Sequence, residues 1–221
     1  MQTYHSIKEE CEQSNAQLVA VSKTKPASQI QEMYDLGQRI FGENKVQELC
    51  EKADILPKDI EWHLIGHLQS NKVKYIAPFV SLIHAVDSIK LLKEINKQAL
   101  KNDRVIDCLL QIKIAEEDSK FGIDPASIED FLAEVAALEL NNVRIRGLMG
   151  MATFTSDENQ IKEEFHKLSG LKENLSEHEV LDVNNFDQLS MGMSGDYKIA
   201  LKEGSNLVRI GSLLFGARNY G

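Results

Sequence analysis

With 221 residues, 43% of them hydrophobic and 27% charged, the chain is long enough for one large α/β barrel domain with a sizeable core. Its formal net charge of −9 argues against nucleic-acid binding, because phosphate neutralisation requires basic patches. The N-terminus is polar and no apolar run approaches membrane-spanning length, so we expect a soluble, cytoplasmic protein that contacts no membrane. The three widely spaced cysteines form no CxxC pair, which favours reduced thiols over a disulfide framework.

Eight short apolar segments alternate with helical patterns along the chain. A polar helix is expected over 3–15, ahead of a first strand that starts at Leu18. The following strands are predicted at 39–44, 61–66, 81–86, 108–114, 144–151, 188–193 and 206–216. The helices between them are predicted at 27–37, 45–56, 70–78, 89–101, 126–139, 157–175 and 195–203.

This alternation indicates a single (β/α)8 TIM-like barrel with an extra N-terminal helix, one domain over residues 1–221. An open, doubly wound parallel sheet is the alternative. The glycine fingerprint GxGxxG that such sheets carry after the first strand is missing here. We therefore expect a barrel, with its active site at the C-terminal ends of the strands.

Lys23 directly follows the apolar first strand, and Pro26 opens the next helical pattern as a first-turn proline. A lysine in this place is badly solvated, which favours the neutral amine that attacks carbonyls to form a Schiff base. A surface lysine in a loop is the ordinary alternative. We expect Lys23 rather than Lys25 to be the covalent residue, because Lys25 lies beside a helix start and Pro26 keeps it extended and exposed.

The seventh strand ends in small residues, where barrels commonly place phosphate sites. Alternation puts Ser190, Gly192 and Ser194 on the lumen face, which leaves room for a bound molecule, while larger neighbours pack outward. Ser194 and Gly195 open a predicted helix whose N–H groups attract phosphate. An ordinary serine cap is the alternative.

The eighth strand places Arg209 and Gly211 on one face. A guanidinium among apolar strand residues is costly unless it has a partner, and the alternative to a ligand is a buried carboxylate such as Glu43. The backbone amides at Gly211 and Ser212 are suited to phosphate oxygens. Together with Lys23, these features describe a site for a phosphorylated aldehyde, and pyridoxal 5′-phosphate (PLP) is the obvious candidate.

The segments that carry this site also carry a family resemblance. They read VSKTKP at 21–26, FGEN at 41–44, WHLIG at 62–66, GLM at 147–149, LSMGMS at 189–194 and VRIG at 208–211. In this order and spacing the chain resembles the pyridoxal phosphate homeostasis proteins (YggS/PROSC-like), whose fold is similar to the barrel domain of alanine racemase.

The resemblance implies roles for individual positions. Lys23 would form the internal aldimine and Arg209 would face the pyridine nitrogen. The phosphate would lie against the loops after strands seven and eight, with three further positions near the ring. The expected cofactor-binding residues are Lys23, Asn44, His63, Met149, Ser194, Gly195, Arg209, Gly211 and Ser212.

The implied function is PLP binding on Lys23 in PLP homeostasis and amino-acid and keto-acid balance, rather than efficient catalysis. The alternatives are a PLP-dependent amino-acid racemase or other PLP enzyme of low activity, a cofactor-free Schiff-base lyase, and a partner-binding regulatory protein. PLP and PLP-dependent apoenzymes are the implied partners. The acidic, charge-rich outer helices and the lack of a second domain favour a monomer.

Racemisation by two bases requires an acid or base on each face of the substrate. In the racemase that this barrel resembles, the second base is a tyrosine from another domain across a dimer. The chain ends at Gly221, soon after the last strand, and Tyr197 is the tyrosine nearest the barrel mouth. We therefore expect no efficient racemase activity and no catalytic residue.

Histidine spacing gives little sign of a metal site. His63 and His67 are four residues apart, but they flank the end of a strand rather than lie on one helix. The other histidines, His84 among them, have no metal-ligand spacing. We therefore expect no bound metal.

Overall fold

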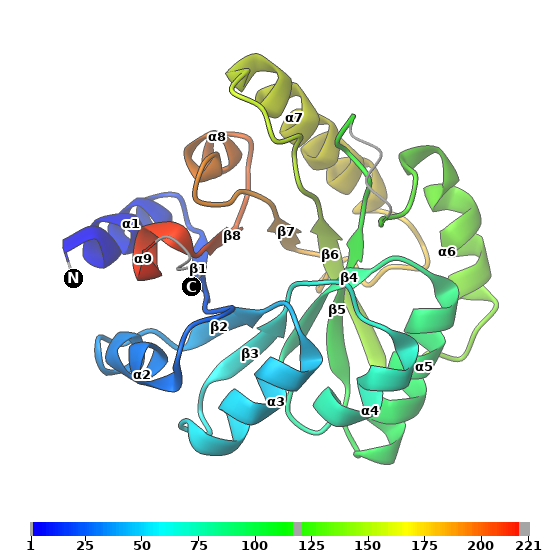
Figure 1. Ribbon diagram of the computed structural model, residues 1–221. Helices are drawn as coiled ribbons and strands as arrows, with labels where there is room; N and C mark the ends of the chain where they lie inside the picture. The colour runs from blue at the N-terminus through cyan, green and yellow to red at the C-terminus, as the bar shows by residue number, and fades with distance from the viewer. Residues whose placement is uncertain (1, 117–120, 217–221) are drawn as a thin grey trace.

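The computed structural model describes residues 2–116 and 121–216, which contain eight parallel strands closed into a barrel in chain order. Pairing of β8 with β1 closes the barrel, and helices surround it on the outside (Figure 1). The predicted (β/α)8 TIM-like fold is therefore confirmed. The strands are β1 (Gln17–Val21), β2 (Ile40–Glu43), β3 (Glu61–Leu64), β4 (Leu82–Val86), β5 (Ile106–Gln111), β6 (Val143–Met149), β7 (Gln188–Ser190) and β8 (Leu207–Ile210).

Helix α1 (Gln2–Gln13) precedes the barrel, as predicted, and lies beside the short last helix α9 (Figure 1). Two short 3₁₀ turns, η1 (Ser70–Lys72) and η2 (Pro125–Ser127), lead into α4 and α6. The remaining helices are α2 (Ala27–Asp35), α3 (Val46–Ile55), α4 (Val73–Ile76), α5 (Ile89–Lys101), α6 (Ile128–Ala136), α7 (Glu158–Leu175), α8 (Tyr197–Lys202) and α9 (Ser212–Phe215).

The last two strands are shorter than predicted. Gly192 has a φ of 93°, which leaves the extended region, so β7 ends at Ser190. After Ile210 the chain turns into α9, because the N–H groups of Leu214 and Phe215 donate to the Gly211 carbonyl. The predicted strand 206–216 is therefore a four-residue strand followed by a helical turn.

The core has two layers, one inside the barrel and one between the strands and the helices. A small apolar cluster fills the lumen, and a large cluster packs the outer layer. Leu189 and Met191 belong to the outer cluster, while Ser190 between them is fully buried on the other face, as the alternation predicts. The prediction is wrong beyond Met191, since a Cβ at Gly192 would lie 2.6 Å from Ala200 on α8 and Met193 lines the cavity. The lumen cluster consists of Val19, Leu82, Ala85, Leu109, Met149 and Leu207.

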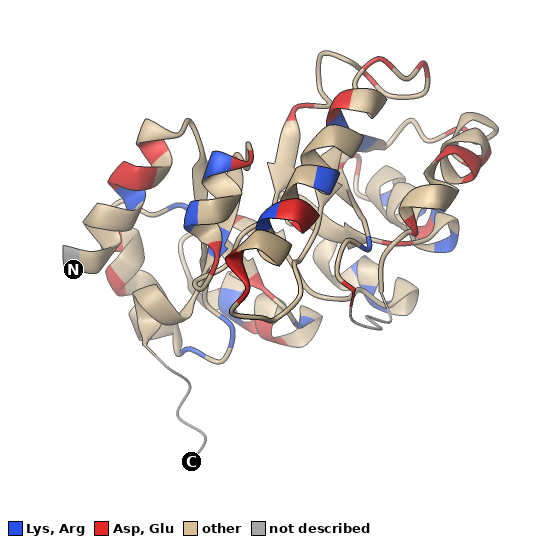
Figure 2. Cartoon of the chain, turned by 90° about the horizontal axis from the view of Figure 1, so that it is seen from above, with Lys and Arg blue, Asp and Glu red and all other residues tan. Residues whose placement is uncertain are grey.

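Acidic and basic residues alternate along the outer helices in the view of Figure 2. Within residues 2–116 and 121–216, no helix combines the length and the apolar character needed to cross a bilayer. The same residues contain no group of three or more His, Cys, Asp or Glu side chains placed to hold a metal ion.

Candidate functional site

Lys23 lies in a tight turn at the C-terminal end of β1. Thr24 has a φ of 64°, which is uncommon for a residue with a side chain, and the Lys25 N–H donates to the Ser22 carbonyl at 3.0 Å. The Thr24 N–H donates to Glu48 Oε1 at 2.6 Å, which ties the turn to α3. Lys23 is therefore held half-buried at the mouth of the barrel.

A buried ion pair supports this turn from the helix side of the sheet. Lys52 Nζ on α3 donates to Glu43 Oε1 and to the Ser22 carbonyl, each at 2.7 Å. Ser22 Oγ donates to the same carboxylate oxygen at 2.5 Å. Burial raises the pKa of Glu43, and the hydrogen bond and charge of Lys52 oppose that rise. Glu43 is thus the partner of Lys52, and the alternative in which it pairs with Arg209 is wrong.

A cavity of about 470 Å³ opens at the ends of β1, β2, β7 and β8. This volume is within the roughly 300–1,000 Å³ that small-molecule sites occupy. The Gly66 backbone packs against that of Asn44, where a Cβ would lie 2.5 Å from the Asn44 carbonyl oxygen, so this contact requires glycine. The lining includes seven of the predicted site residues: Lys23, Asn44, Ser194, Gly195, Arg209, Gly211 and Ser212.

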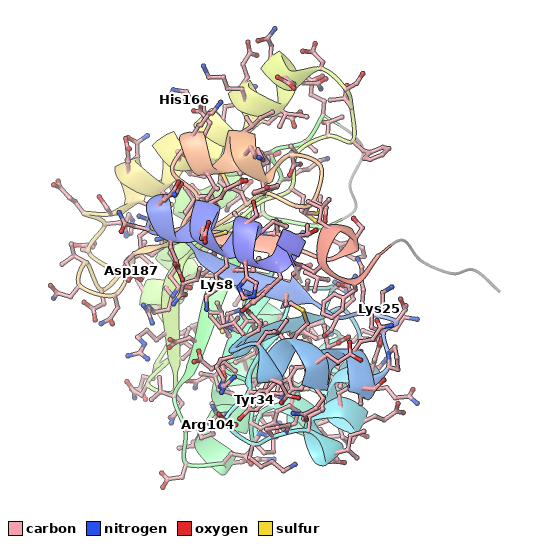
Figure 3. The ribbon with its side chains drawn as sticks, turned by 90° about the vertical axis from the view of Figure 1, so that its left-hand side faces the viewer. Lys8, Lys25, Tyr34, Arg104, His166 and Asp187 are labelled. Carbon is pink, nitrogen blue, oxygen red and sulfur yellow. The ribbon has the colours of Figure 1, made fainter. Side chains whose placement is uncertain are left out.

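Lys25 lines the same cavity and is half-buried, so its predicted exposure is wrong. Its Nζ donates to the Phe215 carbonyl at 2.8 Å and to the Gly216 carbonyl at 3.3 Å, at the C-terminal end of α9. Figure 3 labels Lys25 in the loop between β1 and α2. These two hydrogen bonds hold the side chain toward α9 and account for its half-buried position.

The two loops after β7 and β8 meet at one side of the cavity. Ser194 Oγ accepts a hydrogen bond from the Gly211 N–H at 3.3 Å. The N–H groups of Asp196 and Tyr197 donate to the Met193 carbonyl at 3.1 and 2.9 Å, so α8 begins at Tyr197 rather than at 195. The predicted helix start at Gly195 is therefore wrong.

Because α8 starts late and is short, Ser194 and Gly195 lie in the loop ahead of it, and its dipole contributes less at this point than the prediction assumed. A Cβ at Gly195 would meet nothing within 4 Å, so no neighbouring atom crowds this residue of the cavity lining. The side chain of Asp196 also lines the cavity, and burial raises its pKa. Anion binding here would rest on hydroxyls and loop amides.

Arg209 is 4% exposed, and its side chain extends from β8 to the neighbouring β7 and to the end of β6. Its Nη1 donates to Ser190 Oγ at 2.5 Å and its Nη2 donates to the Gly150 carbonyl at 3.0 Å. Burial lowers the pKa of Arg209 to about 10, against the raising effect of Asp196, so the side chain is charged at neutral pH. A buried cation with neutral partners is well suited to a polar ligand in the cavity that it lines.

Two histidines continue the polar contacts of Arg209 into the lumen. His84 Nδ1 lies 3.0 Å from Ser190 Oγ, and His84 Nε2 lies 3.0 Å from His63 Nδ1. Burial lowers the pKa of His63 to about 3. Burial, then the His63 and Arg209 charges, lower the pKa of His84 well below its usual value. Both rings are therefore neutral at pH 7.

His84 was not among the predicted site residues, because it has no metal-ligand spacing to another histidine. It stands in a strand of otherwise apolar residues, and its parity with Leu82 puts it on the lumen face. That isolated polar position was the available signal. The other two predicted site residues, His63 and Met149, are buried in the lumen and do not line the cavity.

Comparison with known proteins places this arrangement in a family. The family model for the N-terminal domain of alanine racemase matches residues 2–219. The pyridoxal phosphate homeostasis protein of Aquifex aeolicus is 40% identical, with 97% of this chain and 94% of that protein covered. The protein of the same name from Escherichia coli is 39% identical, with 92% and 86% covered. The chain belongs to the pyridoxal phosphate homeostasis protein family.

Solved structures show the same likeness to this family. PipY of Synechococcus elongatus, solved without PLP, is 35% identical with a TM-score of 0.89, and 97% of this chain and 99% of that chain are covered. PipY with PLP bound is 36% identical over the same shares, with a TM-score of 0.86. Alanine racemase from Bartonella henselae is 14% identical with a TM-score of 0.72 over 99% and 60% of the two chains, a likeness of fold alone.

Proposed function

We propose that the protein binds PLP as a Schiff base on Lys23 and holds, buffers or delivers it in PLP homeostasis. The observation that carries this proposal is the convergence of a half-buried lysine, a buried arginine and two small-residue loops on one cavity of about 470 Å³. The relative PipY has been solved with PLP bound, which supports the same ligand here. The amino-acid and keto-acid balance of the cell is the process that such a cofactor store would influence.

The residues around the cavity fit the groups of this cofactor. PLP supplies an electrophilic aldehyde, a ring nitrogen and a phosphate. Lys23 is the residue for the aldehyde, and Arg209, which only donates hydrogen bonds, is the residue for the ring nitrogen. Three cationic side chains line the cavity against one carboxylate, which suits a dianionic phosphate: Lys23, Lys25 and Arg209 against Asp196.

The loops after β7 and β8 are the proposed phosphate site. Ser194 and Ser212 offer hydroxyls, and Gly195 and Gly211 bring backbone close to the cavity. A Cβ at Gly211 would lie 3.2 Å from the Val21 carbonyl oxygen, so a larger residue would press against β1. Asn44 lines the cavity and is proposed to lie beside the ring, while His63 and Met149 are buried in the lumen and would support the ring position from beneath the cavity.

Absorbance spectroscopy tests the proposal. The wild-type protein, mixed with PLP and desalted, is expected to retain the absorbance of a lysine-bound cofactor. Lys23→Ala is expected to lose it, because the covalent bond is gone. Lys25→Ala is the matched control, since Lys25 lines the same cavity, and it should keep the band. Equal retention by wild type and Lys23→Ala would contradict the assignment.

We also propose that the protein is not an efficient catalyst. Among the described residues that line the cavity there is no histidine, cysteine or tyrosine, and the titratable groups are Lys23, Lys25, Asp196 and Arg209. The Tyr197 hydroxyl donates to Glu10 Oε2 on α1 at 2.9 Å. Asp196 accepts the Met193 N–H at 2.5 Å. This leaves Lys23 without a well-placed second base for exchange of a substrate proton.

The proposal further includes a cytoplasmic monomer that passes PLP to apoenzymes. The formal net charge of −9 and the mixed charges on the outer helices oppose self-association (Figure 2). Light scattering at several concentrations would show the mass of one chain if this is right, and a concentration-independent dimer mass if it is wrong.

A further inference from the structure

A chain of buried polar side chains runs below the cavity and ends at Arg209. Four residues from four strands take part, namely His63 on β3, His84 on β4, Ser190 on β7 and Arg209 on β8. Each is at most 4% exposed, and the three contacts that link them measure 3.0, 3.0 and 2.5 Å. Buried polar side chains such as these destabilise an apolar barrel core unless each hydrogen-bond donor faces an acceptor.

The donor and the acceptor in each of these hydrogen bonds can be worked out from Arg209. A guanidinium can only donate, so Ser190 Oγ accepts from Arg209 Nη1. Within the described part of the chain, the second contact of Ser190 Oγ is His84 Nδ1. The serine hydrogen therefore has an acceptor only if it points at an unprotonated Nδ1.

The Ser190 hydrogen bond also determines which nitrogen carries the hydrogen in His84 and in His63. A neutral His84 with an unprotonated Nδ1 carries its hydrogen on Nε2, which then donates to His63 Nδ1. His63 in turn carries its hydrogen on Nε2. The reverse order would leave the Ser190 hydroxyl hydrogen facing the hydrogens of Arg209 and His84, and an extra proton on either ring would add a second buried cation.

We propose that Ser190, His84 and His63 are positioning residues that hold the Arg209 guanidinium through this one-directional hydrogen-bond chain. Together with the Gly150 carbonyl, which accepts from Nη2 at 3.0 Å, they fix the plane of a side chain that lines the cavity. Rotation of Arg209 would break contacts to Ser190 and Gly150 together. The effect on a bound cofactor rests on the proposed function, whereas the hydrogen-bond direction does not.

Nitrogen NMR of the apoprotein, labelled with ¹⁵N-histidine, tests the chain without any ligand. Unprotonated Nδ1 and protonated Nε2 are expected in both His63 and His84 at pH 7. A hydrogen on Nδ1 of either ring, or a doubly protonated ring, would overturn the proposal. This measurement uses wild-type protein, so it does not depend on the folding of a variant.

Ser190→Ala then tests the positioning role, with Ser205→Ala as the matched control. Ser205 is also buried beside β7, but its Oγ donates to the Met191 carbonyl at 2.7 Å and does not join the chain. Ser190→Ala should shift the His84 nitrogen signals and weaken retention of PLP about tenfold or more, because a buried hydrogen bond to a charged group is lost. Ser190→Thr, which keeps the hydroxyl, should restore both.

The outcomes separate the two claims. Unchanged PLP affinity and absorbance in Ser190→Ala, with Ser205→Ala behaving alike, would overturn the positioning role. If wild-type protein retains no PLP at all, the proposed function fails, while the NMR result still tests the direction of the hydrogen bonds from Arg209 to His63. Displaced histidine signals in Ser205→Ala to the same extent as in Ser190→Ala would show a general packing effect and would also overturn the proposal.

Discussion

At the scale of single residues, Lys23 and Lys25 line one cavity but differ in their backbone support. Lys23 lies in a turn fixed by Glu48 and by the Lys52 contact to the Ser22 carbonyl. Lys25 Nζ donates to the Phe215 and Gly216 carbonyls at the C-terminal end of α9. These contacts hold the Lys25 amine at α9, and Lys23 stays the residue proposed for the Schiff base.

The two lumen histidines make stability depend on pH. The pKa of His63 is lowered to about 3 in the folded protein, against about 6.5 when unfolded, so the unfolded chain takes up the proton first. The contribution of His63 is therefore complete above about pH 6.5 and falls as the pH drops toward 3. At pH 5 the expected loss from His63 alone is roughly 2 kcal/mol.

Urea unfolding at pH 7.5 and pH 5 measures this loss. His63→Gln should show a smaller drop in unfolding free energy than wild type, because the titrating ring is gone. His166→Gln is the control, since the His166 side chain is 79% exposed. Equal drops in His63→Gln and wild type would contradict the prediction.

At the scale of elements, the strands themselves were predictable but the ends of the last two were not. Apolar runs with period two located all eight strands, because a buried strand needs them whatever surrounds it. The late start of α8 depends on Met193, whose carbonyl takes the N–H groups of Asp196 and Tyr197. That contact comes from the local fold of a loop, which the hydrophobic pattern does not encode.

The pairing of polar groups was also hard to predict. Parity placed Ser190 on the lumen face and Arg209 on one face with Gly211, but the contact of Ser190 with His84 joins β7 to β4, which are not neighbours in the barrel. Gly42 faces the lumen, where a Cβ would lie 2.9 Å from Val19, so its neighbour Glu43 faces the helices. The same parity argument, applied to β2, would have excluded the pairing of Arg209 with Glu43.

The Glu43–Lys52 pair joins three elements, and its loss should be costly. Lys52→Met leaves the Glu43 carboxylate buried with only the Ser22 hydroxyl, and an orphaned buried charge costs about 3–5 kcal/mol. The double variant Glu43→Gln with Lys52→Met should regain part of that loss, since the buried charge is removed. Urea unfolding of the two variants checks this. A cost below about 1 kcal/mol for Lys52→Met, the range of an exposed pair, would contradict it.

At the scale of the whole molecule, the closed barrel brings the ends of β1, β7 and β8 to one mouth, although the first and last strands are far apart in sequence. The fold class followed from the sequence, and seven of the nine site residues predicted from the sequence and the family resemblance line one cavity. The roles of these residues stay predictions. Neither the sequence nor the family resemblance predicted that His63 and Met149 are buried in the lumen, because their position depends on how side chains fill the barrel.

Proton exchange tests the catalytic side of the proposal for the whole protein. With PLP present in deuterated water, L- and D-alanine should exchange their α-hydrogens far more slowly than with ordinary enzymes, which turn over at about 10 s⁻¹. The expected deficit is at least ~10²-fold, the usual cost of a missing general base. Asp196→Asn should leave the slow rate unchanged, and exchange near 10 s⁻¹ that this variant abolishes would identify Asp196 as a second base.

The covalent site of the cofactor is the most direct test of the central claim. The wild-type protein is incubated with PLP, reduced with borohydride and digested, and the modified lysine is located by mass spectrometry. We expect one reduced adduct, on Lys23, together with loss of the cofactor absorbance band. An adduct that maps to Lys25, or to surface lysines without preference, would contradict the site described here.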